Sequence, residues 1–353
     1  MSKGKLWVLG NGLKQIIHRV VFVGACLLCS GFFAEGSLAK PAATSAAKPA
    51  ATPADWLSRM VTASASTTYK GLFIYESASG QMAMRIFHTF EEGKLRERLI
   101  YQNGPYREIV RYGDQLAFIR PDGDVSRYRT EGVNGLVDRL ANYQDDLRHS
   151  YRLLFGSDDR VAGREALRID IQPRDSHRYG YAIWIDRETA LLLRSDLIDE
   201  KGVILERLQY VGISMPDKIS AELLMPSREV VWQQAFQKSS DQSVQSGLAH
   251  LSWDTGWVPS GFKLAGISQT DSPVSQQKAD SLLFSDGLAT FSVFVEKDQS
   301  RMHGSASEQN GATSAVSHLF RDGEDYYNVT VIGEIPLGVA ERVAVSVKSQ
   351  ASE

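Results

Sequence analysis

Apolar and polar positions alternate most regularly between residues 179 and 213, in the sequence YGYAIWIDRETALLLRSDLIDEKGVILERLQYVGI. This alternation, with many β-branched and aromatic residues, predicts three β-strands. Two polar turns separate them, at 186–189 and 199–202. The alternating positions are Arg194, Asp196 and Ile198 in one strand and Ile204, Glu206 and Leu208 in the next. We therefore expect a sheet with one solvent-exposed face and one face that covers other parts of the protein.

Strand signals also recur at regular intervals between residues 69 and 128, separated by short turns rich in Gly, Asn, Asp and Pro. Such short connections force neighbouring strands to be antiparallel. A helix is predicted at 133–146, and four more strands are predicted between 160 and 211. The first domain, residues 55–215, is thus expected to be a long antiparallel sheet with two helices. A sheet of about ten strands tends to curl, and curling around the helices would give a half-closed barrel.

The N-terminal residues 1–39 have the pattern of a cleavable export signal. Four basic residues flank the uncharged apolar run Val20–Phe33, and a small-x-small triplet follows at 37–39. The run is shorter than the roughly 20 apolar residues of a membrane anchor. Residues 40–54, KPAATSAAKPAATPA, predict an extended tether. Thr52 is expected to cap a short amphipathic helix, because a proline and then an acidic residue follow it.

A second, smaller domain is predicted from residue 251 to residue 350. Residues 216–250 have little periodicity and become rich in Gln and Ser, so we predict a linker before it. The clearest signal in this domain is the sequence LLFSDGLATFSVFVE at 282–296, where a Ser-Asp-Gly turn separates two apolar runs. Residues 336–347 are predicted to close the domain as a helix.

Several of these segments resemble the MucB/RseB family. They are the strand meander at 179–213, W-x-P-x-G-F at 257–262, SDGLATFSVFVE at 285–296 and VTVIGEIP at 329–336. The resemblance covers everything beyond the signal and the tether. It implies a mainly β fold with some α structure (α+β): a large LolA-like half-barrel of curved antiparallel sheet around helices, and a smaller α+β C-terminal domain.

The resemblance also implies a function, that of a periplasmic negative regulator of the sigma-E envelope-stress response. Such a protein binds the periplasmic part of a membrane-spanning anti-sigma factor, protects it from regulated proteolysis, and is released by lipid or lipopolysaccharide. The family is further implied to form homodimers or higher homo-oligomers.

Composition narrows the class of protein further. Both cysteines, Cys26 and Cys29, lie in the segment predicted to be removed. The exported chain therefore has no thiol for a disulfide, for catalysis or for a metal site. Removing the four basic and one acidic side chains of that segment changes the formal charge from −3 to −6. This charge and the exported location argue against nucleic acid as a partner.

The sequence contains no recognisable motif for catalysis. No histidine of the exported chain has a second histidine three or four residues away, and no Glu-x-x-His pair could begin a metal site. A G-x-S-x-G elbow, a P-loop and a dinucleotide-binding glycine motif are also missing. We therefore expect no enzyme, no cofactor and no metal site, and a hydrolase is the weakest hypothesis.

Arginine is concentrated in one region. Seventeen arginines and no lysine occur between Leu95 and Glu200. Because a guanidinium can bind carboxylate or phosphate through two parallel hydrogen bonds, some of them could hold an acidic peptide or a lipid head group. The candidates are Arg96, Arg98, Arg107, Arg111, Arg120, Arg127 and Arg129. The alternative is a solvated sheet face on which the acidic residues of the same stretch balance the charge.

Large apolar side chains of the first domain are the candidates for lipid contact. They are Trp56, Phe73, Phe87, Phe118, Leu136, Leu140, Tyr143 and Trp184. The simpler interpretation places each of them in an ordinary core. A cleft between a curved sheet and helices need not be filled, however, and an acyl chain of about 12 carbons would gain roughly 10 kcal/mol there before entropic costs. The competing function is a periplasmic lipid or lipoprotein carrier, which needs the cleft but not the second domain.

Overall fold

The computed structural model describes residues 51–129, 135–142, 144–232, 253–275, 277–298 and 305–349. The predicted signal peptide and all but the last four residues of the predicted tether lie outside these ranges. The first described element is α2 (Pro53–Ser66), which has the expected cap. Thr52 Oγ1 accepts a hydrogen bond of 3.2 Å from the Asp55 amide, and the Thr52 amide donates one of 2.7 Å to Asp55 Oδ2. This reciprocal pair satisfies two amides that would lack a helical partner, so the helix begins at Pro53.

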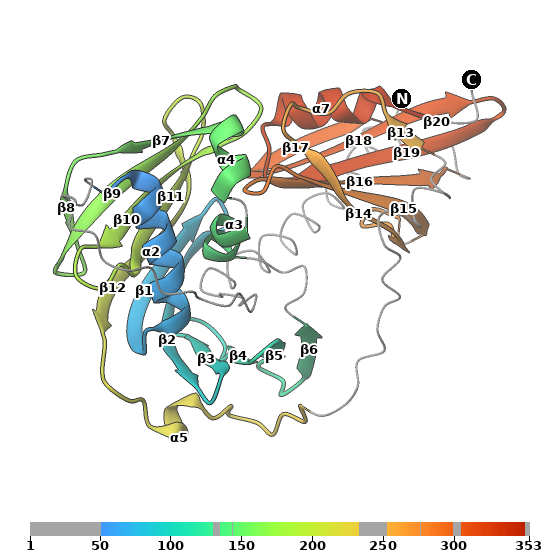
Figure 1. The fold of residues 1–353 in the computed structure, drawn as a ribbon. Helices are drawn as coiled ribbons and strands as arrows, with labels where there is room; N and C mark the ends of the chain where they lie inside the picture. The colour runs from blue at the N-terminus through green and yellow to red at the C-terminus, as the bar shows by residue number, and fades with distance from the viewer. Residues whose placement is uncertain are drawn as a thin grey trace.

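Twelve strands form one large antiparallel sheet (Figure 1). They are β1 (Tyr69–Ser77), β2 (Gly80–Glu91), β3 (Lys94–Tyr101), β4 (Glu108–Tyr112), β5 (Gln115–Ile119), β6 (Val125–Arg129), β7 (Tyr151–Phe155), β8 (Asp159–Val161), β9 (Arg164–Pro173), β10 (Gly180–Asp186), β11 (Leu192–Ile198) and β12 (Ile204–Ser214). Their order is β6-β5-β4-β3-β2-β1-β12-β11-β10-β9-β7, with β8 beside β9. The first strand pairs with the last, β1 with β12, and this pairing joins the two halves of the sheet.

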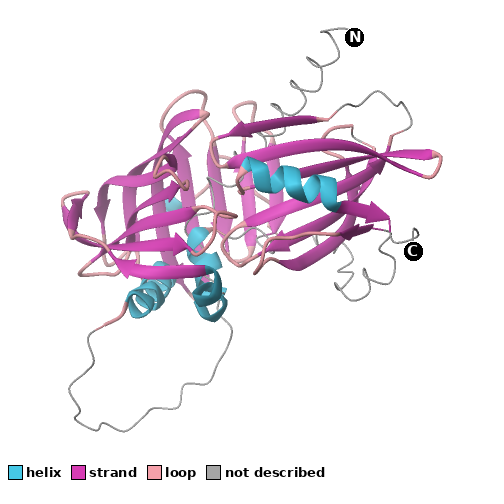
Figure 2. Cartoon of the chain, turned by 90° about the horizontal axis from the view of Figure 1, so that it is seen from above, coloured by secondary structure: helices cyan, strands magenta, loops and turns pink. Residues whose placement is uncertain are grey.

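Helices lie on one side of this curved sheet, as predicted (Figure 2). They are α2, α3 (Leu136–Asn142) and α4 (Gln144–Ser150). Leu57 and Met60 of α2 and Leu136 and Leu140 of α3 are at most 1% exposed. They join strand residues such as Ile169 in one apolar cluster. Burial of each such side chain stabilises the fold by roughly 1.5–3 kcal/mol, so the described helices fill the concave side rather than leave it open.

The opposite face of the sheet is not the solvent-exposed face that the alternation predicts. Trp184 is 4% exposed on it, and Asp196 is 1% exposed. The Arg194 guanidinium lies 4.0 Å from the centre of the Trp184 ring and also binds Asp196. Arg207, on the next strand, contacts the same carboxylate at 2.8 Å. The prediction of a wet face is wrong here, because cross-strand ion pairs and arginine stacking shield these polar groups from water.

A second, six-stranded antiparallel sheet forms the smaller part of the protein. Its strands are β14 (Lys263–Asp271), β15 (Lys278–Ser285), β16 (Thr290–Lys297), β17 (Ala306–Asn310), β18 (Thr313–Asp322) and β19 (Asp325–Gly333), in the order β14-β15-β16-β19-β18-β17. Helix α7 (Leu337–Ser346) packs on one face and buries Val339 and Val343. The short strands β13 (Trp253–Thr255) and β20 (Val347–Ser349) pair beside it. The predicted closing helix and the hairpin at 282–296 are confirmed.

The start of the predicted linker is held against the large sheet. We call residues 219–232, which include α5 (Ala221–Leu224), the strap. Ile219 and Leu224 are buried beside Phe87 on the face opposite the helices. The Ser227 amide donates a hydrogen bond of 2.5 Å to Glu108, and Arg127 donates one of 2.7 Å to the Val231 carbonyl oxygen. The strap therefore crosses several strands before the chain reaches the second sheet.

Candidate functional site

The two sheets meet where the turn between β15 and β16 enters the core of the large sheet. Leu288, in this turn, has no exposed surface and belongs to the apolar cluster of α2, α3 and the large sheet. Asp286 Oδ1 accepts hydrogen bonds from the amides of Leu288 (2.8 Å) and Ala289 (2.7 Å), which fix the shape of the turn. Figure 1 shows the small sheet against the end of the large sheet where α3 and α4 lie. We call the contacts between the two sheets the domain junction.

A buried ion pair lies at the centre of the domain junction. Arg178 Nη1 is 2.5 Å from Asp286 Oδ2, and neither side chain is exposed. The same guanidinium binds both oxygens of Asp175 at 3.0 Å and also donates to the Ser260 carbonyl oxygen. Tyr151 donates a hydrogen bond of 3.0 Å to Asp286. Because a buried charge costs several kcal/mol unless it is paired and hydrogen-bonded, these partners hold the two domains in one relative position.

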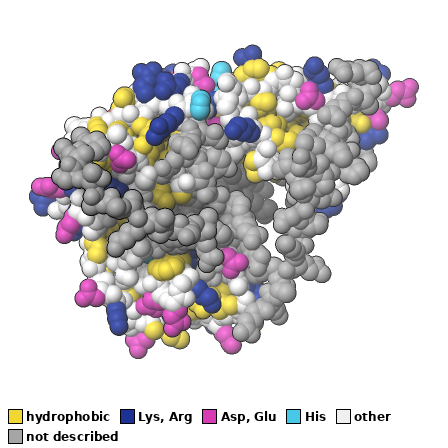
Figure 3. Space-filling view, viewed as in Figure 1, with side chains coloured by type: hydrophobic (Ala, Val, Ile, Leu, Met, Phe, Trp, Pro, Cys, Tyr) yellow, Lys and Arg dark blue, Asp and Glu magenta, His cyan; other side chains and the backbone are white. Residues whose placement is uncertain are grey.

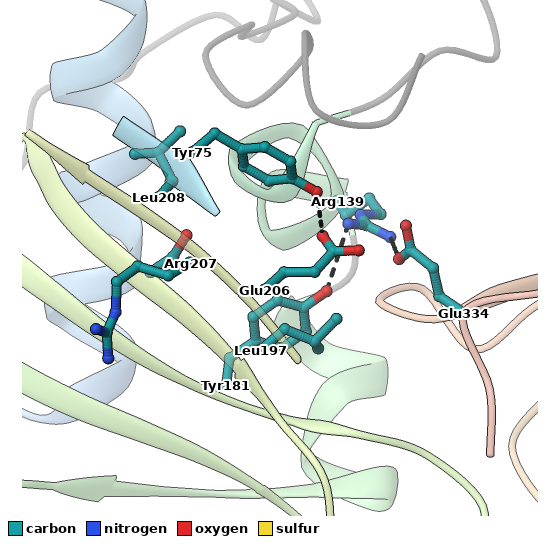
Figure 4. Close-up of a pocket in the computed structure, with 9 residues that line it drawn as sticks. Tyr75, Arg139, Tyr181, Leu197, Glu206, Arg207, Leu208 and Glu334 are labelled. Carbon is teal, nitrogen blue, oxygen red and sulfur yellow. Dashed lines mark hydrogen bonds and ion pairs between the residues drawn. The ribbon is translucent and has the colours of Figure 1, made fainter. Parts of the chain in front are cut away.

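A second part of the domain junction surrounds a small cavity of about 30 Å³ (Figure 4). Arg139, on α3, donates hydrogen bonds to the Leu288 carbonyl oxygen (2.7 Å) and to Glu334 Oε2 (3.2 Å) of the small domain. On its other side the cavity is lined by Glu206, which accepts a hydrogen bond of 2.7 Å from the Tyr75 hydroxyl. A cavity needs about 10–15 Å³ of such space to hold a water molecule. The cavity therefore has room for a water molecule and not for an acyl chain.

Burial changes the proton affinity of the groups around this cavity. Burial, and then the nearby charge of Glu334, raise the pKa of Glu206 to about 7. Burial also raises the pKa of Tyr75 well above its ordinary value, so this hydroxyl remains a hydrogen-bond donor at neutral pH. For Arg139, burial acts against the charged form, but Tyr181 and Glu334 outweigh it and the pKa is raised. One permanent cation thus lies beside two carboxylates from different domains.

Further contacts between the two domains lie at the edge of the domain junction. Gln309 donates a hydrogen bond of 3.1 Å to the Tyr179 hydroxyl. The Trp257 ring contacts His177 edge to face at 5.5 Å. Gly261 has a positive φ of 88°, and a Cβ atom there would lie 2.5 Å from Ser150 Oγ. Because the Ser150 hydroxyl and the Arg178 guanidinium approach Gly261 this closely, and because its φ is positive, only glycine fits at this point.

The lipid candidates do not gather around one cavity. Phe73, Leu136 and Leu140 are in the core beside the helices, and Trp56 and Phe118 are partly exposed at its margin. Phe87 and Trp184 lie on the opposite face of the sheet, under the strap and between arginines. Tyr143 lies outside the described residues. An acyl chain that reached Leu136 or Leu140 would have to displace side chains that already fill this space.

The candidate arginines also have separate environments. Arg98 binds Glu108 beneath the strap, and Arg127 binds the Val231 carbonyl oxygen. The others described are Arg96 beside Glu91, Arg107 over the Tyr101 ring, Arg111 bonded to the Gly113 carbonyl oxygen, and Arg120 paired with Asp124. The side chain of Arg129 is outside the described part. Each of the described arginines thus already contacts a carboxylate, a carbonyl oxygen or an aromatic ring, and on the face seen in Figure 3 basic and acidic side chains are interspersed.

The residues that connect the two domains were not among the sequence candidates. Arg139 and Arg178 belong to the lysine-free region, and Asp286 belongs to the predicted Ser-Asp-Gly turn, but nothing in the sequence links them. One feature of the sequence could have pointed to the domain contact at Arg139. Arg139 lies between the apolar residues Val137 and Leu140 of the helix predicted at 133–146, and an arginine buried among such residues needs an acidic partner.

Two larger hollows of about 410 Å³ each lie elsewhere on the described surface. One is formed by the β1–β2 turn, the start of β12 and Gly311 of the small domain, and the other by α2 and the β10–β11 turn. Within the described ranges, no three His, Cys, Asp or Glu side chains are grouped as a metal site requires. No helix in this part of the chain is long and apolar enough to cross a membrane.

Comparison with known proteins places the chain in a family. Residues 52–228 match the MucB/RseB N-terminal domain, and residues 248–348 match the MucB/RseB C-terminal domain. The chain is 34% identical over 317 residues to the sigma factor AlgU regulatory protein MucB of Pseudomonas aeruginosa, which covers 87% of this chain and 94% of the relative. The name of that relative describes a regulatory protein.

Solved structures of MucB are similar to this chain over both of its domains. MucB in the Pseudomonas aeruginosa MucA/MucB complex has a TM-score of 0.71 and 31% identity, covering 85% of this chain and 99% of that one. A further crystal structure of MucB has a TM-score of 0.54 and 29% identity, covering 84% of this chain and 98% of that one. With both of its domains matched, this chain belongs to the MucB/RseB family.

Proposed function

We propose that this protein is a periplasmic negative regulator of an envelope-stress sigma factor. In this proposal it binds the periplasmic segment of a membrane-spanning anti-sigma factor and shields that segment from the protease that begins its degradation. The protein acts by binding and performs no catalysis. The support is the sigma factor regulatory role in the name of its Pseudomonas relative, together with the MucA/MucB complex.

The observation that carries this proposal is the arrangement of the two domains. The TM-score is 0.71 with MucB in the MucA/MucB complex and 0.54 with a separate crystal structure of MucB, although the coverage is nearly equal. The contacts at Arg178, Asp286 and Leu288 hold the arrangement described here. The higher similarity to the structure from the complex supports the proposal that the domain junction described here belongs to the partner-binding state.

Titration of the exported chain, beginning at Lys40, with the periplasmic domain of its anti-sigma factor tests the proposal. We expect a complex at micromolar concentration or below, and slower cleavage of the bound domain by the protease that begins its degradation. The same domain with a scrambled sequence is the matched control. Absence of a complex at micromolar concentration, in a sample that is folded by circular dichroism, would remove the proposed function.

We further propose that lipid or lipopolysaccharide is the signal that weakens binding of the anti-sigma segment. The concave core around Leu136 and Leu140 is filled where it is described, so lipid entry requires α3 to move. Because Arg139 on α3 binds the small domain, such movement would reach the domain junction directly. We also carry forward, as a proposal, assembly into a homodimer or larger homo-oligomer.

A further inference from the structure

Two carboxylates from different domains face one guanidinium at the domain junction (Figure 4). Glu334 follows β19 of the small domain and binds Arg139 at 3.2 Å. Glu206 belongs to β12 of the large domain and accepts its hydrogen bond from Tyr75 rather than from a cation. Arg139 also donates to the Leu288 carbonyl oxygen at 2.7 Å, so part of its hydrogen-bonding capacity is already used. With both carboxylates ionised, two negative charges share one positive charge.

No other described cation lining the cavity faces Glu206. The lining groups that can titrate or carry charge are Tyr75 on β1, Arg139 on α3, Tyr181 on β10, Glu206 and Arg207 on β12, and Glu334 after β19. Arg207 points away in Figure 4, and its guanidinium binds Asp196 at 2.8 and 2.9 Å on the opposite face of the sheet. The remaining lining residues, Ser195, Leu197 and Leu208, are neutral. Among the described groups, Arg139 alone therefore balances the charge of Glu206, and Glu334 already binds this guanidinium.

We propose that Glu206 and Glu334 make the domain junction sensitive to protons, so that protonation of Glu206 tightens the docking of the two domains and its ionisation loosens it. Domain docking brings Glu334 up to Glu206 and reduces the contact of both carboxylates with water. Separation of the domains returns Glu206 to solvent and takes Glu334 away. The docked form must then bind a proton more tightly than the separated form.

The direction of the effect follows from proton linkage. Burial and the charge of Glu334 raise the pKa of Glu206 from an ordinary 4.5 to about 7 in the docked form. A raised carboxyl pKa favours docking most strongly below the ordinary value, and this contribution is lost as the pH rises through about 7. From these two values, the docking equilibrium is expected to weaken about ten-fold between about pH 6 and about pH 8.5.

Fluorescence energy transfer can measure docking without any partner. The exported chain from Lys40 has no cysteine, so dyes can be attached at Lys201→Cys and Glu324→Cys, two exposed turn positions, one in each domain. We expect the docked fraction to fall as the pH rises. Glu206→Gln, which keeps a hydrogen-bond acceptor for Tyr75 without the charge, should remain docked with no dependence on pH over this range.

Two further variants complete the test. Glu334→Gln removes the repelling charge and leaves Arg139 to neutralise Glu206, so the transition should move to lower pH. Glu200→Gln, at an exposed turn position on the large domain, is the matched control and should behave like the unmodified chain. An unmodified chain whose docking does not change with pH, or a folded Glu206→Gln variant that keeps the same pH response, would overturn the inference.

The effect of pH on binding of the anti-sigma factor rests on the function proposed above. It is measured in a separate binding experiment. Partner affinity is expected to change with pH in parallel with docking, and Glu206→Gln should remove this dependence. If the chain binds no anti-sigma segment at any pH, the proposed function fails while the energy-transfer result is unaffected. If partner binding occurs but docking is independent of pH, only the proton sensitivity fails.

Discussion

Arg178 of the large domain and Asp286 of the small domain form an ion pair of 2.5 Å from which solvent is excluded. The two residues are 108 positions apart in the sequence. The pair joins the two domains. Asp286 also fixes the shape of the turn that places Leu288 in the core of the large domain. The stability of the large domain is therefore coupled to the position of the small one.

The first prediction concerns this ion pair. Arg178→Met keeps much of the side-chain volume but leaves Asp286 buried without its cation, so the free energy of unfolding should fall by about 3–5 kcal/mol. The matched control is Arg120→Met, which breaks a pair whose two side chains are 40% and 55% exposed and should cost under about 1 kcal/mol. Urea denaturation of both variants checks the difference. Equal losses in the two variants would show that the buried pair does not couple the domains.

The second prediction concerns Leu288. Leu288→Ala removes a fully buried side chain from the shared core, and the free energy of unfolding should fall by about 2–5 kcal/mol. Leu283→Ala on the preceding strand serves as control, since Leu283 is 38% exposed and its loss should cost about 0.5 kcal/mol or less. Thermal unfolding of Leu288→Ala should also separate into two transitions, because the domains lose a common core. A single transition at the original temperature would contradict this expectation.

The third prediction concerns the strap. Glu108 is buried and accepts hydrogen bonds from Arg98 at 2.7 Å and from the Ser227 amide at 2.5 Å. Burial alone would raise the pKa of Glu108, but Ser227 and Arg98 outweigh it and the pKa is lowered. The stabilisation is therefore present above the ordinary carboxyl pKa and is lost as the pH falls through the lowered value.

Glu108→Gln should weaken the strap in the same way at neutral pH. Hydrogen exchange of the Ser227 amide is expected to accelerate by ten-fold or more, which corresponds to roughly 1.4 kcal/mol. Glu91→Gln, at a carboxylate 42% exposed and 3.7 Å from Arg96, is the control and should leave that amide unchanged. Unchanged exchange in both variants would mean that Glu108 does not hold the strap.

The fourth prediction concerns lipid. If an acyl chain enters the large domain near Leu136 and Leu140, it must displace α3, and amide exchange in α2 and α3 should increase when a saturated C12 lysophospholipid is added. Leu140→Trp should reduce this lipid binding by filling the space further, while Leu154→Trp, at a position 39% exposed on β7, should not. Lipid binding without any change in α2 or α3 would show that these candidates do not form the lipid site.

Local interactions made much of the fold predictable. The Thr52 cap, the polar turns of the meander and the hairpin at 282–296 depend on contacts between residues a few positions apart, and all were predicted correctly. Asp186 Oδ1, for example, accepts hydrogen bonds from the amides of Glu188 and Thr189 in its own turn. Strands β7 and β8 were missed. The three residues of β8 are too few to show a period, and Leu154 and Phe155 on β7 are exposed instead of alternating.

The sequence by itself determined most of the strands, the cap of the first helix, the turns and the family, because these depend on short spacings and on segments that can be compared directly. Only the tertiary structure decided which arginines meet which carboxylates. Arg139 and Glu334 are 195 positions apart, and Tyr75 and Glu206 are 131 apart, so no local pattern relates them. Their contact requires the β1–β12 pairing and the entry of the β15–β16 turn into the large core. The domain junction therefore follows from long-range packing, which places one cation between the carboxylates of two domains.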